Sequence, residues 1–366
     1  MAYGPAGLLL NPPRERLSKT EWVGGEYEGW GGLRVKTRSK PCAFPCLRRR
    51  RRGAARGESS GALVGSLVLN RFLIERRIGS GGFGVVYEAW DGRLERPVAV
   101  KAIEQRGEAG RRVLREAQAA ARLNHPGIVT LYELGEEDGN ALLVTELVEG
   151  STLARLAHEG ELSDREIGEI GADLCEALDH AHSRGVVHRD VKPQNVQVTD
   201  GEPRAKLMDF GIASLADGSA LTQTGDVVGT LAYMSPEQAE GRPAGPEADV
   251  YSLALTLYEC WSEENPHLRS SPAATARSIG SRTRSLRRLR PDLPRELTDA
   301  IDASLAARPG RRPALEELGT AIEDSLELLA DDLHQTRRSF RIRAAAMAAA
   351  VAIGAWLALG HGALIP

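Results

Sequence analysis

The sequence predicts an α+β protein in which a smaller, strand-rich part is followed by a larger helical part. Short apolar runs with strand character follow one another between residues 68 and 147. Patterns with the 3.6-residue period of helices begin near residue 153 and continue to about residue 329. Apolar residues make up 42% and charged residues 27% of the 366 residues, which is typical of a soluble globular body. One large two-part domain with an appendage at each end fits this length.

Residues 1–66 are predicted to form a disordered basic tail, because they are rich in Gly, Arg, Pro and Ser and have no sustained period. Residues 1–60 hold 13 Lys or Arg against 5 Asp or Glu, a charge of +8, whereas the rest of the chain carries −11. The run Arg48–Arg52 could bind nucleic acid or anionic lipid. No folded module or aromatic interleaving accompanies it, so nucleic acid is not the favoured partner. A solvated tail and an upstream stretch that is never translated are the simpler interpretations.

A glycine-rich stretch follows the first predicted strand, Val68–Arg77. It reads Ile78-Gly79-Ser80-Gly81-Gly82-Phe83-Gly84, and an apolar run that includes Val86 comes directly after it. In dinucleotide-binding folds a helix follows such glycines, whereas here the apolar run continues as a strand, which predicts a hairpin. A glycine backbone can approach phosphate groups closely because no side chain obstructs it. The stretch therefore favours a phosphate-bearing ligand.

A lysine ends the next predicted strand. The strand reads Val98-Ala99-Val100-Lys101, and its lysine falls 17 residues after Gly84. A helix is predicted over 112–123, and it carries Glu116 where a carboxylate could pair with Lys101. An edge strand with a solvated lysine and a helix with a solvated carboxylate are the simpler alternatives.

The most informative stretch lies on a loop between two regular elements. It reads His188-Arg189-Asp190-Val191-Lys192-Pro193-Gln194-Asn195, and Asp209-Phe210-Gly211 follows shortly after it. A helical pattern, Ile167–Ser183, precedes the loop, and a short strand pattern, 195–199, comes after it. The polar side chains of the loop are therefore expected to be held between rigid elements.

These residue types suit the transfer of a phosphoryl group. Asp190 can accept a hydroxyl proton, and Lys192 can neutralise charge on the moving phosphoryl group. Asn195 and Asp209 supply hard oxygen ligands, which Mg²⁺ prefers. Taken alone, the first tripeptide could also be a turn with a solvated charge pair.

Together, and in this order, the motifs resemble those of the protein kinases. The resemblance covers roughly residues 68–330 and is particularly close to bacterial Ser/Thr kinases of the eukaryotic-like (Hanks) type, including membrane-anchored kinases of actinobacteria. It implies the bilobal protein-kinase fold, with an antiparallel-sheet lobe and one main helix over 67–148 and a helical lobe over 149–330. Lys192 is the residue that marks Ser/Thr-specific rather than Tyr-specific members.

The resemblance implies ATP as the nucleotide and Mg²⁺ as the metal, with Mn²⁺ as an alternative. It assigns catalytic roles to Asp190, Lys192 and Asn195, and metal binding to Asn195 and Asp209. Glu146 and Val148 would offer backbone groups to adenine, and Thr145 would close the back of the pocket. The full set that it implies for nucleotide binding is Ile78, Gly79, Gly81, Gly84, Val86, Ala99, Lys101, Glu116, Thr145, Glu146 and Val148.

A regulatory segment is expected between Gly211 and Ser235-Pro236-Glu237. It carries Thr222 and Thr224, which are predicted to be autophosphorylated. Arg189, next to the catalytic Asp190, could pair with a phosphothreonine and order the segment. A homodimer would allow this phosphorylation to occur between two copies. Plain loop threonines are the alternative.

The remainder of the helical lobe has mainly architectural roles in the resemblance. Asp249 is expected to brace the catalytic loop, and Arg312 is expected to pair with Glu237. A last helix is predicted over Leu315–Leu329. The Ser- and Arg-rich region Arg269–Arg290 departs from the usual kinase pattern, and the sequence gives it no assignment.

The end of the chain resembles a membrane anchor. Residues 331–343 include the basic run Arg337–Arg343, and residues 344–366 hold 23 residues without charge. This length suffices to cross a bilayer core of ~30 Å, and the basic flank would keep the kinase domain in the cytoplasm. We therefore predict a single-pass protein of the cell membrane. A soluble Ala-rich helix in a cytoplasmic protein is the alternative.

The sequence as a whole predicts a Mg²⁺- and ATP-dependent enzyme that phosphorylates Ser or Thr hydroxyls of proteins and activates itself. A membrane-tethered pseudokinase or scaffold that binds ATP without efficient transfer is the first alternative. A membrane-tethered nucleic-acid binder that acts through Arg48–Arg52 is the second. Intact Lys101, Glu116, Asp190, Asn195 and Asp209 favour the enzyme.

Overall fold

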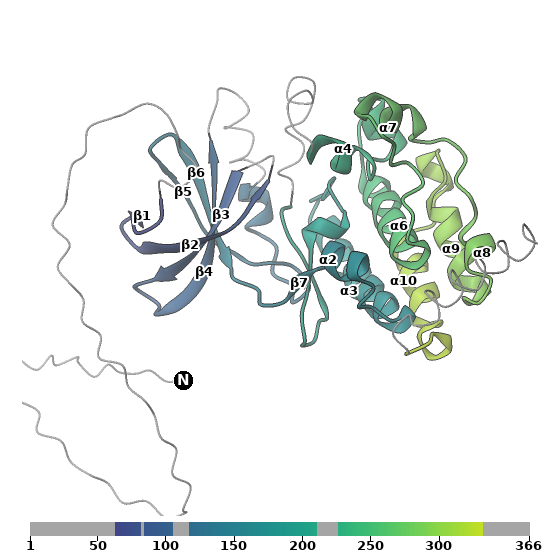
Figure 1. The fold of residues 1–366 in the computed structure, drawn as a ribbon, viewed down its shortest axis with the longest axis horizontal. Helices are drawn as coiled ribbons and strands as arrows, with labels where there is room; N and C mark the ends of the chain where they lie inside the picture. The colour runs from purple at the N-terminus through teal and green to yellow at the C-terminus, as the bar shows by residue number, and fades with distance from the viewer. Residues whose placement is uncertain (1–62, 82–83, 105–116, 211–225, 332–366) are drawn as a thin grey trace, which may run out of the picture. The chain divides into compact units, whose positions relative to one another are not determined.

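The computed structural model describes residues 63–81, 84–104, 117–210 and 226–331, all of which belong to one compact unit of the chain. The segments expected to form the basic tail, the self-phosphorylated loop and the membrane anchor therefore lie outside the described residues. Glu116 lies outside them too. Figure 1 gives the order and labels of the elements.

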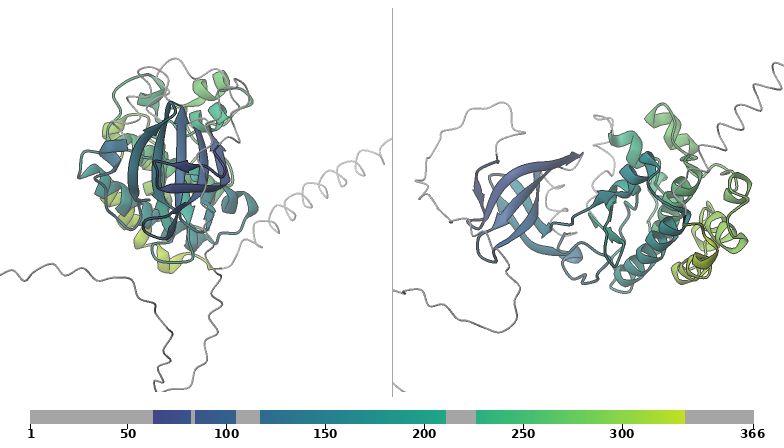
Figure 2. Two further views of the ribbon diagram at one scale, coloured as in Figure 1. Left: turned by 90° about the vertical axis from the view of Figure 1, so that its left-hand side faces the viewer. Right: turned by 60° about the horizontal axis from the view of Figure 1, so that its bottom comes forward.

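The strand-rich part is one antiparallel sheet of six strands, ordered β1-β2-β3-β4-β6-β5. The strands lie side by side with a marked twist (Figure 2). One face of the sheet buries the larger apolar set, which includes Phe72, Tyr87 and Val144. The other face buries Ile103 and Leu143 against Ala117, which opens a helical stretch over 117–120. The strands are β1 Leu67–Val68, β2 Phe72–Gly81, β3 Gly84–Asp91, β4 Arg96–Glu104, β5 Leu131–Glu137 and β6 Asn140–Glu146.

The glycine-rich stretch forms the hairpin between β2 and β3, as its sequence predicts. Gly81 pairs with Gly84, and Gly79 pairs with Val86. Gly84 has a φ of +141°, and a Cβ there would lie 2.2 Å from the carbonyl oxygen of Ala102 on β4. Only glycine fits at this position, because the backbone of β4 occupies the space that a side chain would need.

The helical part is organised around α6, Pro246–Ser262, which is buried along most of its length. Its sequence is apolar on every side, as expected of a helix that lies inside a protein. The long helix α3, Asp164–His182, packs against α6 and against α10, Leu315–Glu323. Ser163 and Glu166 form the capping box that the sequence predicts at the start of α3. The other helices are α2 Leu153–Glu159, α4 Asp226–Leu231, α5 Pro236–Ala239, α7 Pro272–Ser278, α8 Leu286–Leu289 and α9 Arg295–Ser304.

A small antiparallel sheet includes the strand that directly follows the catalytic loop, residues 188–195. It contains β7 Ser151–Thr152, β8 Val196–Val198 and β9 Ala205–Leu207, in that order. The one-turn helix η1, Pro193–Asn195, immediately precedes β8. The predicted strand over 195–199 is therefore shorter than expected, because its first residue belongs to η1.

One prediction about the end of the domain needs correction, and one region without an assignment gains one. The last helix does not continue from Leu315 to Leu329. It ends at Glu323, where the hydroxyl of Ser325 donates a 2.7 Å hydrogen bond to the carbonyl oxygen of Ala321, and the one-turn helix η4, Leu326–Leu328, follows. The region that the sequence left unassigned, 269–290, contains α7 and α8 joined by a loop.

None of the helices in the described ranges combines the length and the apolar character needed to cross a bilayer. The predicted anchor, 344–366, lies outside those ranges.

Candidate active site

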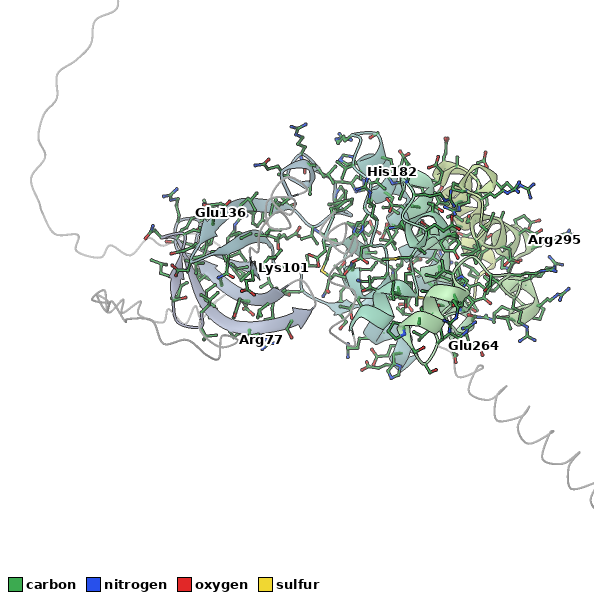
Figure 3. The ribbon with its side chains drawn as sticks, turned by 90° about the horizontal axis from the view of Figure 1, so that it is seen from above. Arg77, Lys101, Glu136, His182, Glu264 and Arg295 are labelled. Atoms are coloured by element: carbon green, nitrogen blue, oxygen red, sulfur yellow. The ribbon has the colours of Figure 1, made fainter. Side chains whose placement is uncertain are left out.

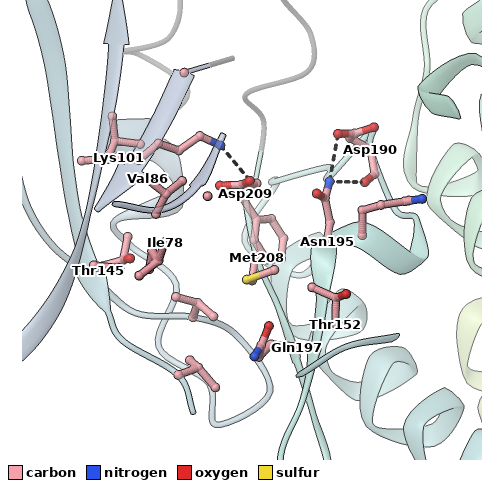
Figure 4. Close-up of a pocket in the computed structure, with 18 of the residues that line it drawn as sticks. Ile78, Val86, Lys101, Thr145, Thr152, Asp190, Asn195, Gln197, Met208 and Asp209 are labelled. Atoms are coloured by element: carbon pink, nitrogen blue, oxygen red, sulfur yellow. Dashed lines mark hydrogen bonds and ion pairs between the residues drawn. The ribbon is translucent and has the colours of Figure 1, made fainter. Parts of the chain in front are cut away.

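A pocket of 1070 Å³ is lined by residues of both the strand-rich part and the helical part. Its apolar side chains come from the glycine hairpin, from β4 and β6, and from the segment before Asp209, and Figure 4 shows several of them. Its polar side chains include Asp190, Lys192 and Asn195 from the catalytic loop and Thr230 from α4. The pocket thus has an apolar region that suits a flat ring and a charged region that suits phosphates and a hydroxyl.

Most of the residues predicted to bind a nucleotide line this pocket. The residues concerned are Ile78, Gly79, Gly84, Val86, Ala99, Lys101, Thr145, Glu146 and Val148. Gly81 is the last residue of β2 and pairs with Gly84, and its predicted contact with the nucleotide stays a prediction. Glu116 is outside the described residues, so its predicted pairing with Lys101 stays a prediction.

Glu146, at the end of β6, lines the pocket and offers it backbone polar groups. Its amide N–H donates to the carbonyl oxygen of Thr130 over 2.9 Å. Its carbonyl oxygen accepts a long 3.3 Å hydrogen bond from the hydroxyl of Thr145. A carbonyl acceptor in an apolar pocket suits an exocyclic amine of a base.

Lys101 lies where the sheet borders the helical part (Figure 3), and its side chain extends to Asp209 (Figure 4). It lies on β4 between Val86 of β3 and Leu143 of β6. Its Nζ is 2.7 Å from Oδ2 of Asp209. Asp209 has a φ of +61°, a conformation that non-glycine residues rarely adopt. A cation and a carboxylate are therefore held together at the position where phosphates and a metal ion would meet.

Asp190 is the centre of a buried cluster on the catalytic loop. Lys192 Nζ donates to both of its carboxylate oxygens, at 3.0 and 2.8 Å, and also to the hydroxyl of Thr230 at 3.0 Å. Asn195 Nδ2 donates to Oδ2 of Asp190 at 2.9 Å and to its carbonyl oxygen at 2.8 Å, as drawn in Figure 4. These contacts fix the carboxylate and leave the amide oxygen of Asn195 as an acceptor.

Asp249 of α6 fixes the catalytic loop, residues 188–195, through hydrogen bonds to the loop backbone. Its two carboxylate oxygens accept hydrogen bonds from the backbone N–H groups of His188, at 2.8 Å, and Arg189, at 2.7 Å. The ring of His182 is 2.7 Å from the same carboxylate. Arg189 has a φ of +65°, so the carboxylate holds the loop in a backbone conformation that costs free energy. The predicted bracing role of Asp249 is confirmed.

The ring of His188 links the catalytic loop to the segment Met208–Phe210. Its Nε2 is 2.8 Å from the carbonyl oxygen of Met208, and its ring centroid is 4.5 Å from that of Phe210. Phe210 is buried. This packing fixes the residue that precedes Asp209 and the residue that follows it, and so positions the carboxylate.

The predicted pair between Glu237 and Arg312 is present and buried. Arg312 binds the two carboxylate oxygens through two nitrogens, at 2.7 and 2.8 Å. Burial alone would raise the pKa of Glu237, but the hydrogen bonds and charge of Arg312 outweigh it and lower that pKa. The same guanidinium also donates to the carbonyl oxygen of Glu247 on α6. The pair therefore ties the segment that follows the active site to the central helix.

Several residues of the pocket and its surroundings were not predicted from the sequence, and Met208 and Lys206 are two of them. Met208 lines the pocket beside the apolar residues of the sheet. Lys206 on β9 places its Nζ 2.5 Å from Oε1 of Glu146, at the junction of the two parts. Met208 directly precedes Asp209 in the sequence, and this position could have identified it as a pocket residue. Lys206 had no such signal, because 60 residues separate it from Glu146 and a lysine on a short strand is normally solvated.

Residues 72–321 match the family described as the protein kinase domain. This match spans more than half of the chain, and the fold and the pocket described above agree with it. The chain belongs to the protein kinase family. Among relatives, its sequence resembles those of bacterial Ser/Thr protein kinases.

Three of these relatives illustrate the extent of the similarity. The serine/threonine-protein kinase PknB of Mycobacterium leprae is 42% identical over 219 residues, which cover 57% of this chain and 35% of the relative. PknB of Mycolicibacterium smegmatis is 44% identical over 220 residues, with the same coverage. The serine/threonine-protein kinase PrkC of Bacillus subtilis is 36% identical over 282 residues, which cover 75% of this chain and 43% of PrkC. The similarity thus spans well under half the length of each relative.

Proposed function

We propose that this protein transfers the γ-phosphoryl group of ATP to Ser or Thr hydroxyls of proteins. The observation that carries the proposal is the meeting, in one pocket, of Asp190, Lys192 and Thr230 with Lys101 and Asp209. The first three residues suit a hydroxyl acceptor, and the last two suit phosphates and a metal ion. Membership of the protein kinase family and similarity to bacterial Ser/Thr kinases support the same conclusion.

In the proposed reaction the acceptor hydroxyl attacks the γ-phosphorus, and the bond from that phosphorus to the bridging oxygen of ADP breaks. Asp190 orients the hydroxyl and accepts its proton, since both of its oxygens are fixed by neighbours. Lys192 is bonded to Asp190 and lies beside the acceptor position, where its charge offsets the charge of the transferring group. Lys101 binds the non-transferred phosphates. Catalysis then rests on positioning and charge rather than on a covalent intermediate.

The donor set fits magnesium. Nδ2 of Asn195 is occupied by Asp190, which directs the amide oxygen outward, and Asp209 adds a carboxylate. Oxygen donors of this kind, few in number and completed by phosphates and water, are typical of Mg²⁺, and Mn²⁺ accepts the same donors. In the described ranges, no group of three or more His, Cys, Asp and Glu side chains is arranged to hold a metal ion by itself. When bound, the metal would neutralise charge on the phosphates.

Activation by self-phosphorylation at Thr222 or Thr224 is part of the proposal, although both residues lie outside the described ranges. Its support comes from Arg189. The buried Nε of this side chain has no hydrogen-bond partner among the described residues. A buried, unsatisfied guanidinium nitrogen next to Asp190 is suited to bind a phosphothreonine. A second copy of the chain would present one protomer's threonines to the other's active site.

Attachment to the cell membrane through residues 344–366 is also proposed, with the kinase domain on the cytoplasmic side. Its support is the sequence alone: 23 uncharged residues behind the basic run Arg337–Arg343.

The test of the proposed activity uses the purified full-length chain with ATP and three peptides that differ only in carrying Ser, Thr or Tyr. We expect phosphate on the Ser and Thr peptides alone, and we expect EDTA to abolish the transfer and added Mg²⁺ to restore it. Binding of ATP without transfer to any peptide or to the chain itself would instead establish the scaffold function.

A further inference from the structure

Six exposed arginines lie on consecutive segments of the helical part. They are Arg269, Arg277, Arg282, Arg284, Arg287 and Arg288, and we call them the basic strip. The stretch 265–291 contains no Asp, Glu or Lys, whereas the chain beyond residue 60 is acidic overall. In the sequence, Glu264, labelled in Figure 3, comes directly before this stretch and Asp292 comes directly after it.

The strip is unpaired within the part of the chain that the structure describes. None of its six guanidinium groups forms an ion pair with a described carboxylate. The neighbouring Arg290 contrasts with them, because it is mostly buried and binds Asp164 at 2.5 Å and Asp292 at 2.6 Å. Six exposed cations without counter-charges repel one another, so the strip favours an anionic partner.

Hydrogen bonds of polar side chains fix the backbone of the strip, while the arginine side chains stay exposed on the surface. The backbone N–H of Arg269 donates to the hydroxyl of Thr275, and the hydroxyl of Ser278 donates to the carbonyl oxygen of His267. Further along, the hydroxyl of Tyr258 on α6 donates to the carbonyl oxygen of Arg284. The strip is therefore a fixed surface rather than a loose loop, which reduces the entropy lost on binding.

Asp302 of α9 anchors the last part of the strip. Its carboxylate oxygens accept hydrogen bonds from the hydroxyl of Ser285, at 2.5 Å, and from the backbone N–H of Leu286, at 2.8 Å. Arg282, which precedes these anchored residues in the sequence, borders a hollow of 320 Å³. Asp302 keeps its negative charge, since both donors are neutral, but it forms no ion pair with any of the six arginines.

The strip begins beside the acceptor end of the active-site pocket. Helix α7, which carries Arg277, contacts α4, and α4 contributes Thr230 to the pocket. Gly280, at the start of the loop after α7, lies against Pro236, where a Cβ on the glycine would be 3.3 Å from the proline ring. A polypeptide whose hydroxyl reaches Asp190 therefore has the strip within reach of its flanking residues.

We propose that the basic strip is a docking surface for an acidic segment of the protein substrate, close in sequence to the phosphorylated Ser or Thr. The inference rests on the proposed function and adds a substrate class to it. Arginine suits this role, because its planar guanidinium binds carboxylates through two hydrogen bonds. Docking next to the active site raises the effective concentration of the hydroxyl.

The experiment compares two Thr peptides that are identical except for a short flanking run of Asp and Glu or of Ser and Gly. With the full-length chain we expect the acidic peptide to have roughly tenfold higher kcat/KM, through KM, since several exposed ion pairs each contribute a small factor. Rising salt concentration should shrink this preference. The run is placed on either side of the threonine in separate peptides.

The variant of the strip replaces four arginines with serine, at positions 277, 282, 287 and 288. A matched variant makes the same four changes at other exposed arginines that have no ion pair among the described residues, Arg93, Arg122, Arg308 and Arg311. We expect the first variant to lose the acidic preference and to phosphorylate the neutral peptide at the wild-type rate. The second variant should keep the preference. Equal loss in both variants, or no preference in the wild type, overturns the proposal.

A binding measurement separates failure of docking from failure of the proposed reaction. If no peptide is phosphorylated, fluorescence anisotropy of the labelled acidic peptide still decides: binding that only the strip variant loses supports the docking surface. Vesicles containing phosphatidylserine and duplex DNA serve as competing anions. Arg290, next to the strip, and Ala330, near the end of the described chain, both contact the first residues of α3. The strip therefore lies close to the part of the chain that leads to the proposed membrane segment, and vesicles are included for this reason. Strip-dependent retention by either, without preference for the acidic peptide, reassigns the strip and overturns the proposal.

Discussion

Asp190 shows how single residues determine what this site can do. Its two carboxylate oxygens are held by Lys192 and Asn195, and its backbone carbonyl receives a second bond from Asn195. The carboxylate therefore cannot rotate away from the acceptor position without breaking several buried hydrogen bonds, each of which costs about 1–3 kcal/mol to leave unmade. Residue types and spacing predicted these roles, because all three side chains lie on one short loop. The pairing of Lys192 with Thr230 over 38 positions was not predictable in the same way.

Lys206 provides a prediction at this scale. Its ion pair with Glu146 holds the segment, residues 146–150, that lines the pocket. We expect Lys206→Met to raise the KM for ATP by roughly two- to fivefold and to leave kcat within about twofold, since the pair is partly exposed. Lys206→Arg keeps the charge and should restore the KM. Steady-state kinetics with varied ATP checks this, and an equal rise in both variants would count against a role for the charge.

The buried pair of Glu237 and Arg312 provides a second prediction. Glu237→Gln leaves the guanidinium without its counter-charge, and we expect the free energy of unfolding to fall by about 3–5 kcal/mol. Glu240→Gln breaks an exposed pair with Arg242 and should cost about 1 kcal/mol or less. Urea titrations of both variants measure the difference. Similar losses in the two variants would contradict the account of the buried pair.

The same pair predicts an acid limb in the stability of the wild-type protein. The pKa of Glu237 is lower in the folded state than its ordinary value of 4.5. Its contribution to stability is therefore complete above pH 4.5 and is lost as the pH falls through the lower, folded-state pKa. In Glu237→Gln this part of the pH dependence should disappear, which thermal unfolding between pH 3 and pH 6 would detect.

At the scale of elements, sequence periodicity and local signals predicted helices and strands correctly where a single local feature, such as a cap or a glycine turn, determines the structure. The capping box starts α3, and the glycines form the β2–β3 hairpin. The end of α10 was missed, because the apolar pattern continues past Glu323 into the one-turn helix η4. Helices α7 and α8 were missed because Ser- and Arg-rich sequence hides their few inward residues, such as Thr275 and Leu286.

Gly150 offers a test of how the strand-rich part is joined to the helical part. It has a φ of +133°, and a Cβ would lie 2.0 Å from the carbonyl oxygen of Val198 on β8. We expect Gly150→Ala to lower the free energy of unfolding by roughly 3 kcal/mol, because strain and clash add. Gly160 has a φ of +70° with open space around it, so Gly160→Ala should cost only about 1 kcal/mol. Tryptophan fluorescence in urea measures both, and equal costs would show that the clash is relieved without penalty.

At the scale of the whole molecule, charge is distributed unevenly along the chain. The basic run Arg48–Arg52 and the basic strip are separated by more than 200 residues, yet both stand out against an acidic remainder. Sequence alone could count these arginines but could not tell which are buried. The structure distinguishes Arg290, which is satisfied by Asp164 and Asp292, from the exposed residues of the strip.

Self-activation is the prediction that involves more than one part of the molecule. We expect Thr222→Ala combined with Thr224→Ala to reduce transfer to a Thr peptide by roughly tenfold or more, because Arg189 would then lack the phosphate that orders the segment. Treatment of the wild-type protein with a phosphatase should have the same effect, reversed by incubation with MgATP. Mass spectrometry of the wild type locates the phosphates. Unchanged activity in the double variant would remove this mechanism.

The measurement that tests the central claim most directly is phosphate transfer by the full-length wild type and by Asp190→Asn, with binding of ATP determined for both. The account predicts equal ATP binding and a loss of transfer of roughly 10²–10⁴-fold in the variant, since the carboxylate acts on the acceptor hydroxyl and not on the nucleotide. Asp200→Asn, at an exposed turn, should transfer at the wild-type rate. Transfer by Asp190→Asn at the wild-type rate, or a wild type that binds ATP and transfers nothing, would contradict the account.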